Sequence, residues 1–431
     1  MRDLIPALFV LECVLDRGNS LSEAYRRAHA MYNLSEADRV LLTRAVNYEL
    51  RHHLLLRAQV AEALPRFENS ETQLRLGCLL LSWLRDSDRL DGTDIRQWVI
   101  NTSQTMGLGF TEDDFDLLQK VSFEPSKAPE KYQDNPLAHN ALLLNCPEWV
   151  LEAYTRQFGT EGAARLLRRA GQPSPLYLTV NTLKADASTF AKDPRYHLVE
   201  SISPSYQGGA SLRALTRETE ARHSREVKEG LVFPQDISWF RFLDAVSLPQ
   251  YCRVLHVHAR EGYIAAALAL RASRQEGKVE ANFPTLENMD RAKVLHDRLG
   301  VNNVRPVVSS TQMLKTSLPF DSYDTVVVTP TSSHLGMASR RPEILPSFDA
   351  DRLSVIIQSQ REELLEASFF TARGGILAYA VPSILSEETD QVVESFLSER
   401  KEYRLLTRKA LLQEGKDYGY SLYYAILERT R

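Results

Sequence analysis

The stretch Phe320-Asp321-Ser322-Tyr323-Asp324-Thr325-Val326-Val327-Val328-Thr329-Pro330-Thr331-Ser332-Ser333-His334-Leu335-Gly336 decides how the rest of the chain is read. Its first residues are typical of a turn, and its β-branched middle predicts a short buried strand that ends before Pro330. A buried strand whose carboxyl end opens onto a polar loop is where an open α/β sheet places its ligand. This loop carries hydroxyl groups and one imidazole, but no carboxylate and no thiol.

The rest of the C-terminal half alternates short apolar runs with longer helical patterns. Such alternation favours a doubly wound, mostly parallel sheet, because parallel strands are joined through helix-sized crossovers. One long helical pattern covers residues 353–372, and we expect Gly374 and Gly375 to end it. The predicted strands are residues 254–258, 304–309, 325–329 and 376–380, and residues 418–427 are expected to form a last hairpin.

The N-terminal part, from residue 1 to about 125, shows helical periodicity only. Ser22 can cap one helix and Ser35 opens another, while the nearly all-apolar run 74–84 is expected to be the central helix of a bundle. The polar, proline-bearing residues 126–138 are typical of a linker. The sequence therefore predicts an all-α domain that a linker joins to the rest of the chain.

A smaller α+β region is predicted between these two parts. Two helical patterns, which end near Gly159 and Gly171, precede a predicted strand over residues 176–181. Residues 212–229 then alternate basic and acidic side chains, and we expect them to be exposed and flexible.

The composition is that of an ordinary water-soluble protein. Of 431 residues, 43% are apolar and 25% are charged, and the formal net charge is -4. No apolar run is long enough to span a membrane, so we expect a cytoplasmic protein with no membrane partner. Four scattered cysteines without metal-binding or redox spacing predict reduced, structural thiols. The negative charge does not favour a dominant electrostatic footprint on nucleic acid, so any RNA contact would use local basic patches.

The loop after the strand 325–329 resembles the active-site loop of the RsmB/Sun family of RNA cytosine-5 methyltransferases. In that family the strand ends in Asp-Ala-Pro-Cys-Ser, and a glycine and an arginine-rich segment follow. Pro330, Ser332 and Gly336 keep this pattern, and the run Arg340-Arg341-Pro342-Glu343-Ile344 continues it.

The resemblance extends over nearly the whole chain. Residues 230–238 are similar to the opening segment of the family's methyltransferase domain, and residues 374–388 to its helix-glycine-strand unit. Residues 35–39 and 45–51 are similar to the NusB-like helical domain of bacterial members. The resemblance implies a NusB-like domain over residues 1–125, a small α+β RNA-contacting domain over 139–215, and a Rossmann-like, class I methyltransferase-type domain over 226–431.

RNA, ribosomal RNA in particular, is the partner that the resemblance implies. The small domain's strand ends in Arg-Val-Asn in the family, and Thr179 replaces that arginine here. A solvated helix face explains the arginines near residue 168 equally well, and a solvated helix end explains Arg51-His52-His53. The RNA-binding candidates are Asn181, Lys184, Arg168, Arg169, Arg340 and Arg341.

The reactive groups of the family are missing. Its members attack carbon 6 of cytosine with a cysteine thiolate, assisted by an aspartate, and a second cysteine helps to release the product; a thiolate suits this step because an aliphatic hydroxyl stays protonated near neutral pH. Pro382 stands at the nucleophilic cysteine, Thr331 at the second cysteine and Val328 at the aspartate. Proline offers neither a nucleophile nor a backbone donor.

The cofactor motif is equally altered. The family binds S-adenosylmethionine with Asp-x-Cys-Ala-Ala-Pro-Gly-Gly-Lys-Thr, where His256, His258 and Gly262 mark the matching segment here. Only one glycine remains, and the acids expected beside the ribose and the adenine fall near Asn282 and Ser310. His256 and His258 could bind a metal, but no third ligand is evident and we expect none.

We therefore expect a catalytically inactive relative of the RsmB/Sun methyltransferases that binds ribosomal RNA or a ribosome-assembly partner, and the sequence does not decide whether it still binds S-adenosylmethionine. An active methyltransferase with a relocated site, which would bind S-adenosylmethionine, is the alternative, so whether the chain is an enzyme stays open. A protein-interaction module acting through residues 1–125 is a second alternative. An open, adenosine-sized space between Gly262, Pro330 and Pro382 would favour the active enzyme, and a filled one the inactive relative.

Overall fold

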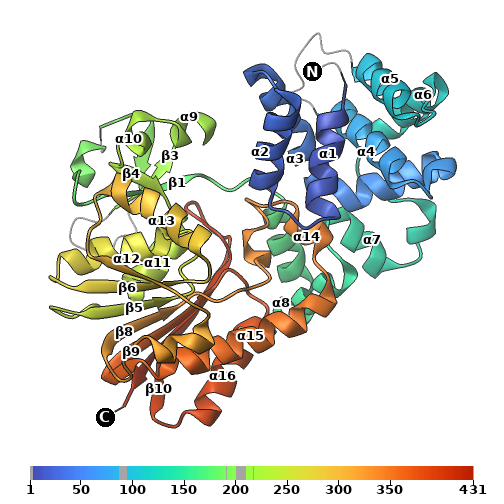
Figure 1. Cartoon of the computed structure of the whole chain (residues 1–431). Helices are drawn as coiled ribbons and strands as arrows, with labels where there is room; N and C mark the ends of the chain where they lie inside the picture. The colour runs from blue at the N-terminus through green and yellow to red at the C-terminus, as the bar shows by residue number, and fades with distance from the viewer. Residues whose placement is uncertain (1–2, 87–94, 191, 200–209, 217, 431) are drawn as a thin grey trace. The chain divides into compact units, whose positions relative to one another are not determined.

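The computed structural model describes residues 3–86, 95–190, 192–199, 210–216 and 218–430 (Figure 1). The chain divides into two compact units. The helical unit consists of Met1–Gln172 and Ala338–Phe348, and the sheet unit of Pro173–Met337 and Asp349–Arg431. The segment with Arg340 and Arg341 thus belongs to the helical unit, although it follows a strand of the sheet unit.

The helical unit is built from amphipathic helices whose ends carry clear caps. Ser35 and Asp38 form a capping box, and the Ser35 hydroxyl accepts from the Asp38 amide at 3.2 Å. Ser20, not Ser22, caps α2, because its hydroxyl accepts from the Glu23 amide. The helices are α1 (Ile5–Leu15), α2 (Leu21–Tyr32), α3 (Glu36–Ala63), α4 (Glu71–Arg85), α5 (Ile95–Met106), α6 (Glu112–Ser122), α7 (Pro136–Leu143), α8 (Glu148–Ala170) and α14 (Ile344–Ser347), with single turns η1 (Pro65–Phe67) and η2 (Glu130–Tyr132).

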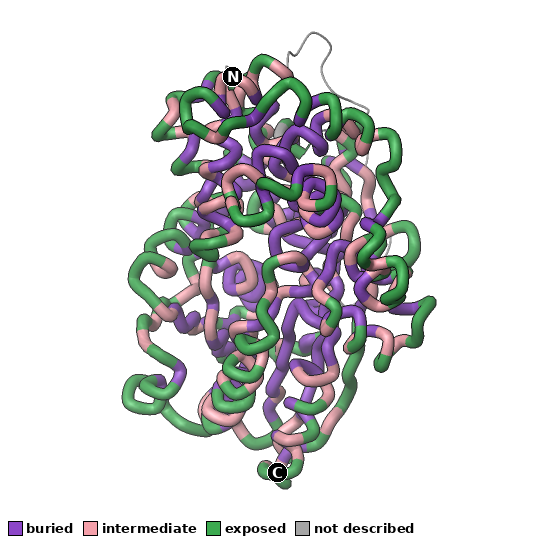
Figure 2. The backbone as a smooth tube through the Cα atoms, turned by 90° about the vertical axis from the view of Figure 1, so that its right-hand side faces the viewer, coloured by how far each residue is buried: buried purple, intermediate pink, exposed green. Residues whose placement is uncertain are grey.

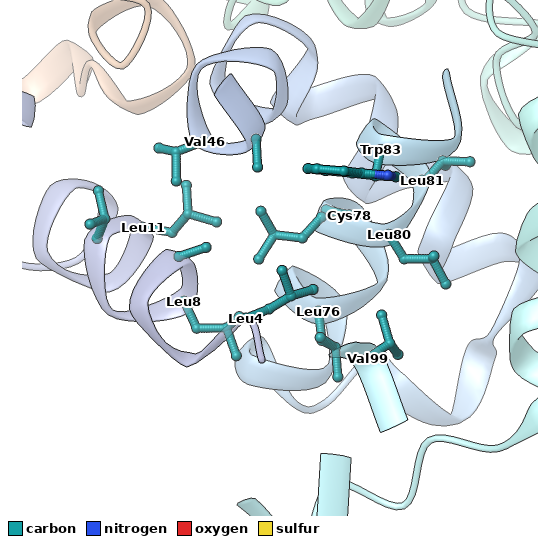
Figure 3. Packing of buried hydrophobic residues seen from close by; sticks show 14 of the residues in the cluster. Leu4, Leu8, Leu11, Val46, Leu76, Cys78, Leu80, Leu81, Trp83 and Val99 are labelled. Atoms are coloured by element: carbon teal, nitrogen blue, oxygen red, sulfur yellow. The ribbon is translucent and has the colours of Figure 1, made fainter. Parts of the chain in front are cut away.

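The core of the helical unit forms around α4, as the apolar run predicts. Leu76, Cys78, Leu80 and Leu81 of α4 are all buried, and together they meet side chains of α1, α3 and α5 (Figure 3). The helix is buried on almost every side, which matches its nearly uninterrupted apolar sequence.

Two local expectations for the helical unit need correction. Arg51, His52 and His53 lie inside α3 rather than at a helix end. The predicted linker contains the turn η2 and the start of α7 and is part of the helical unit.

A small antiparallel sheet opens the sheet unit, with strand order β2-β3-β1-β4. The expectation that residues 212–229 are exposed holds only in part: Glu218, Glu220, Arg225, Lys228 and Glu229 are exposed, but the described residues include strand residues and two short helices in which Leu212 and Val227 are buried. The elements are β1 (Tyr177–Val180), η3 (Ala187–Thr189), β2 (Tyr196–Leu198), β3 (Ser211–Ala214), α9 (Glu218–Arg222), α10 (Arg225–Lys228) and β4 (Val232–Pro234).

A seven-stranded, mostly parallel sheet forms the rest of the sheet unit, which confirms the predicted doubly wound architecture. Its order is β10-β11-β9-β8-β5-β6-β7, and only the pairs of β11 are antiparallel. The strands are β5 (Arg253–Val257), β6 (Lys278–Phe283), β7 (Val304–Val308), β8 (Tyr323–Val328), β9 (Thr371–Val381), β10 (Tyr403–Leu411) and β11 (Leu422–Arg429).

Helices cover both faces of this sheet (Figure 1). One face packs against α11 (Ile237–Ala245), α12 (Tyr263–Ser273) and α13 (Leu286–Leu299), and the other against η4 (Thr311–Thr316), α15 (Ala350–Ser368) and α16 (Asp390–Glu399). The central strands β5 and β8 are consequently buried along most of their length. Buried residues are drawn in purple in Figure 2.

Two expectations for the C-terminal half are wrong. Gly374 and Gly375 do not end a helix but lie inside β9, where the pairing with β8 shifts register and Gly374 has a φ of 77°. The last hairpin is longer than expected, because it pairs β11 with β10, a strand that periodicity did not reveal. Among the residues that the structure describes, no helix has both the length and the apolar character needed to cross a membrane.

Candidate functional site

The candidate site lies where the strand order of the large sheet reverses. From β5 the chain continues to β6 and β7 on one side, whereas β8 and β9 lie on the other. The loops after the neighbouring parallel strands β5 and β8 therefore diverge at one edge, which is where doubly wound sheets bind ligands. We call the segments 258–262, 329–336 and 382–385, which follow β5, β8 and β9, the switch-point loops.

The first switch-point loop has an unusual backbone. The φ angles of His258, Arg260 and Gly262 are 65°, 46° and 80°. Residues other than glycine rarely adopt positive φ angles. Gly262 is also sterically required, because a Cβ there would lie 2.5 Å from the Cβ of Ala292 in α13. The one glycine that remains of the cofactor motif therefore allows α12 and α13 to pack closely.

His256 is a buried, neutral histidine that contacts the loop after β8. It is fully buried, and its Nε2 lies 2.9 Å from the hydroxyl of Thr329. Burial, together with the nearby His258, lowers the pKa of His256 to about 3. The imidazole is thus uncharged at neutral pH and joins β5 to the loop after β8.

Asn282 also serves the architecture of the loops. Its side chain is 1% exposed; Oδ1 accepts from the His258 amide at 3.3 Å, and Nδ2 donates to the Ser309 carbonyl at 2.8 Å. An amide at the end of β6 therefore connects the ends of β5 and β7, where the resemblance expects a ribose-binding acid. Ser310 is exposed and precedes η4 without a side-chain cap.

The Arg260 side chain bridges two switch-point loops. Its Nη1 lies 3.1 Å from Nε2 of His334, and its Nη2 lies 3.5 Å from the carbonyl oxygen of Pro330. Because a guanidinium only donates, His334 accepts through Nε2 and its Nδ1 carries the hydrogen, which faces the Ser332 hydroxyl at 3.2 Å. A charged side chain thus connects the loop that contains Gly262 to the loop that contains Pro330.

His258 contacts a carboxylate of α15. Its Nδ1 lies 3.0 Å from Oε2 of Glu363, a buried carboxylate on α15. His256 and His258 therefore each bind a different protein partner. Among the residues that the structure describes, no group of three or more His, Cys, Asp or Glu side chains could hold a metal ion.

The three positions that the resemblance assigns to reactive groups are engaged within the fold, one in the core and two in hydrogen bonds of the loops. Val328 is fully buried in the core between the sheet and α15. Pro382 is buried, and its carbonyl accepts from the Gly336 amide at 3.0 Å. The carbonyl of the half-buried Thr331 accepts from Nε2 of Gln360 at 3.0 Å.

A buried carboxylate organises the same loops, and sequence reasoning missed it. Glu388 is fully buried, and its Oε1 accepts from the Ser333 amide at 2.8 Å and from Gln360 Nε2 at 2.9 Å. Its own carbonyl accepts from the Tyr379 hydroxyl at 2.7 Å. Glu363, Gln360 and Glu388 come from α15 and η6 (Ser386–Glu388), and no local motif marks them as partners of the switch-point loops.

Two of the RNA-binding candidates, Asn181 and Lys184, lie in the sheet unit and differ in exposure. Asn181 is fully buried, and its Nδ2 donates to the carbonyls of Gly230 and Leu299 at 2.8 and 2.7 Å. The Asn181 amide therefore serves the fold in this structure, and its contact with RNA stays a prediction. Lys184 is exposed, although its Nζ donates to the carbonyls of Glu229 and Arg298 at 3.0 and 2.7 Å.

The other candidates lie in the helical unit. Arg168 is exposed on α8, whereas Arg169 next to it is half-buried. Arg341 donates through Nε to Oε1 of the buried Glu343 at 3.0 Å, and Arg340 is half-buried. Arg51 of α3 holds this segment by donating to the carbonyls of Ser339 and Gly171 at 2.9 and 3.0 Å, so the expected solvated role of Arg51 is also wrong.

The fold places the C-terminal part in the class of Rossmann-like methyltransferase domains, and comparisons with known proteins specify the type. Residues 257–428 match the family of 16S rRNA methyltransferase RsmB/F. The ribosomal RNA small subunit methyltransferase F of Serratia proteamaculans is 27% identical over 229 residues, 51% of this chain and 46% of that protein. The methyltransferase B of Xylella fastidiosa is 27% identical over 253 residues, 58% of each chain.

The matches to these curated relatives span about half of the relatives' own length. The crystal structure of PH0851 is similar to this chain with a TM-score of 0.75 and 18% sequence identity. The match covers 99% of this chain and 98% of PH0851, and at this level of identity it shows a shared fold. The C-terminal part of the chain is thus homologous to the rRNA methyltransferase domain of RsmB/F proteins.

Proposed function

We propose that this chain binds ribosomal RNA as an RsmB/F-type protein that has lost methyl transfer. The observation that carries the proposal is the Arg260 bridge from the loop after β5 to His334 and Pro330. In a doubly wound sheet a cofactor would enter between these loops. A guanidinium and an imidazole connect the two loops here, and this contact favours the inactive relative over the active enzyme.

The chemistry of the surrounding side chains supports the same conclusion. Addition to carbon 6 of cytosine needs a nucleophile with access to the base, and Val328 and Pro382 offer only buried carbon atoms. Ser333 has a carboxylate partner, but its hydroxyl is buried and bound to Glu388. The ionisable groups here stabilise the loops instead of facing a substrate.

The RNA-binding part of the proposal rests on the homology and on the exposed basic side chains. The two curated relatives are named as ribosomal RNA methyltransferases, and binding of the substrate RNA can outlast the chemistry, since phosphate contacts need only cationic side chains. Arg168 on α8 and Lys184 after β1 are exposed and suited to such contacts.

Methyl transfer and rRNA binding test the proposal together. The purified chain is incubated with methyl-labelled S-adenosylmethionine and 16S rRNA, beside heat-killed protein and the Serratia proteamaculans methyltransferase F as controls. We expect no label in the RNA above the heat-killed control, and filter retention of the rRNA that falls steeply with salt. Label above that control would support the active enzyme. Absence of rRNA retention at any salt concentration would contradict RNA binding and favour a protein-interaction module.

A further inference from the structure

Three exposed aromatic side chains lie at the edge of the large sheet where the parallel strands begin, opposite to the switch-point loops. Tyr251 precedes β5, Phe320 precedes β8 and Phe369 precedes β9, and their exposed fractions are 67%, 51% and 38%. Because β5 pairs with β8 and β8 pairs with β9, the segments before these strands meet at one edge. We call these three residues the aromatic row. Exposed apolar side chains that gather at one place mark interaction surfaces, whereas isolated ones are ordinary.

Two rings of the aromatic row are in contact with each other and with the core. The ring centroids of Phe320 and Phe369 are 6.1 Å apart, and the ring of Phe320 also lies 5.8 Å from that of the fully buried Phe370. About half of the Phe320 surface nevertheless remains in solvent. A ring that is already fixed loses little conformational entropy when a planar group stacks on it. The pair therefore offers a preformed surface for stacking.

Guanidinium groups lie beside the rings at this edge. Cζ of Arg400 is 4.6 Å from the ring centroid of Phe369, and Cζ of Arg253 is 4.9 Å from that of the buried Tyr323. The side chain of Arg253, at the start of β5, is 48% exposed. Arg373, near the start of β9, is exposed as well. Aromatic side chains interleaved with cationic ones are typical of surfaces that bind single-stranded nucleic acid.

The carboxylates near the aromatic row already have partners. Asp321 pairs with an arginine of β11, and Asp324 accepts from the Arg253 amide at 2.8 Å. Glu280 lies 4.0 Å from the Arg253 guanidinium but 2.7 Å from that of an arginine of β7. Within the described ranges, Arg373 takes part in no ion pair. A phosphate group can therefore bind Arg373 without displacing a carboxylate, and such contacts supply much of the affinity for nucleic acid.

We propose that the aromatic row binds single-stranded RNA, with bases stacked on Tyr251 and Phe320 and phosphate groups at Arg253 and Arg373. The proposal rests on the RNA-binding part of the proposed function and adds a contact surface away from the switch-point loops. Every base has a π-face, so stacking of this kind tolerates any sequence. The bases of a duplex are already stacked on one another, so the row selects unpaired RNA.

Filter binding of oligo(U) and oligo(A) to the full chain tests the proposal, with an RNA duplex of the same length as comparison. We expect both single strands to bind saturably and more tightly than the duplex. Tyr251→Ala and Phe320→Ala should each weaken this binding about fivefold or more, because one base loses its stacking surface. Tyr251→Phe keeps the ring and should bind as tightly as the unmodified chain. Arg373→Ala should reduce the salt slope by about one.

Phe123→Ala is the matched control, because Phe123 is a phenylalanine of the helical unit that is 76% exposed. It should leave oligonucleotide affinity unchanged, and urea unfolding should show that every variant is folded. The proposal is overturned if neither oligonucleotide binds saturably, or if Tyr251→Ala and Phe320→Ala bind as tightly as the unmodified chain; the row would then be left to a protein partner. Retention of 16S rRNA by a chain that binds neither oligonucleotide would overturn this proposal alone, whereas loss of both would overturn the proposed rRNA binding as well.

Discussion

Arg260 Nη1 lies 3.1 Å from His334 Nε2, and this contact joins the loop after β5 to the loop after β8 across the switch point of the sheet. Both residues have positive φ angles, 46° and 58°, so each loop adopts an uncommon backbone conformation at the contact. Two side chains of the chain itself thus connect the loops on either side of the switch point.

Removal of the bridge should loosen the loops. We expect Arg260→Ala to lower the free energy of unfolding by about 1 kcal/mol, since a partly exposed, charge-assisted hydrogen bond is lost. Amide hydrogen exchange of residues 329–336 should become faster. Arg361→Ala, at an exposed arginine of α15, is the control for both measurements. Unchanged exchange in Arg260→Ala would show that the bridge does not hold the loop.

His256 should make the fold sensitive to mild acid. Its pKa is lowered from 6.5 to about 3 in the folded state, so its contribution to stability is complete above pH 6.5 and is lost as the pH falls toward 3. Between about pH 7.5 and about pH 5.5 this loss amounts to about 1.4 kcal/mol. In His256→Leu, urea unfolding at these two pH values should show a pH-dependent loss that is smaller by about this amount. An identical loss in both proteins would mean that His256 titrates normally.

Gly262 should be required for packing as well as for its backbone angle. Gly415 has nearly the same φ, 79° against 80°, but a Cβ added there would meet nothing within 4 Å. Gly415→Ala should therefore cost only the backbone strain, about 1–2 kcal/mol. Gly262→Ala should cost about 1–3 kcal/mol more, because its Cβ would press against Ala292. Equal destabilisation of the two variants in urea unfolding would argue against the close contact of α12 and α13.

The RNA candidates should separate into binding and structural residues. Arg168→Ala should weaken rRNA binding and reduce the salt slope by about one, without a change in stability, because Arg168 is exposed. Asn181→Ala should lower stability by about 1–3 kcal/mol, because two buried carbonyl groups lose their donor. Filter binding across a salt series and urea unfolding give both readouts. Reduced stability of Arg168→Ala with unchanged rRNA affinity would reverse this assignment.

Much of the architecture could be predicted from the sequence, because burial leaves a direct pattern in it. The apolar runs identified β5, β8 and α4, whose side chains are covered on nearly all sides. The glycine pair at 374–375 was misread because glycine serves both at helix ends and in strand bulges. β10 was missed because most of its residues are exposed, so it shows no apolar alternation.

The site could be predicted only in part. The sequence identified the loops and the missing reactive groups, because these are local features. It could not identify Glu363 as the partner of His258, since the two are 105 positions apart and are brought together only by the packing of α15. It also gave no sign that Asn181 is buried, because a surface asparagine and a buried one look the same in a sequence.

The central claim is that the switch point, whose loops Arg260 and His334 connect, no longer accepts the methyl donor. Calorimetric titration of the full chain with S-adenosylmethionine tests this most directly, with the Serratia proteamaculans methyltransferase F as the binding control. We predict no saturable heat for this chain up to millimolar cofactor. Saturable binding of S-adenosylmethionine by the unmodified chain would contradict the claim and support an active enzyme.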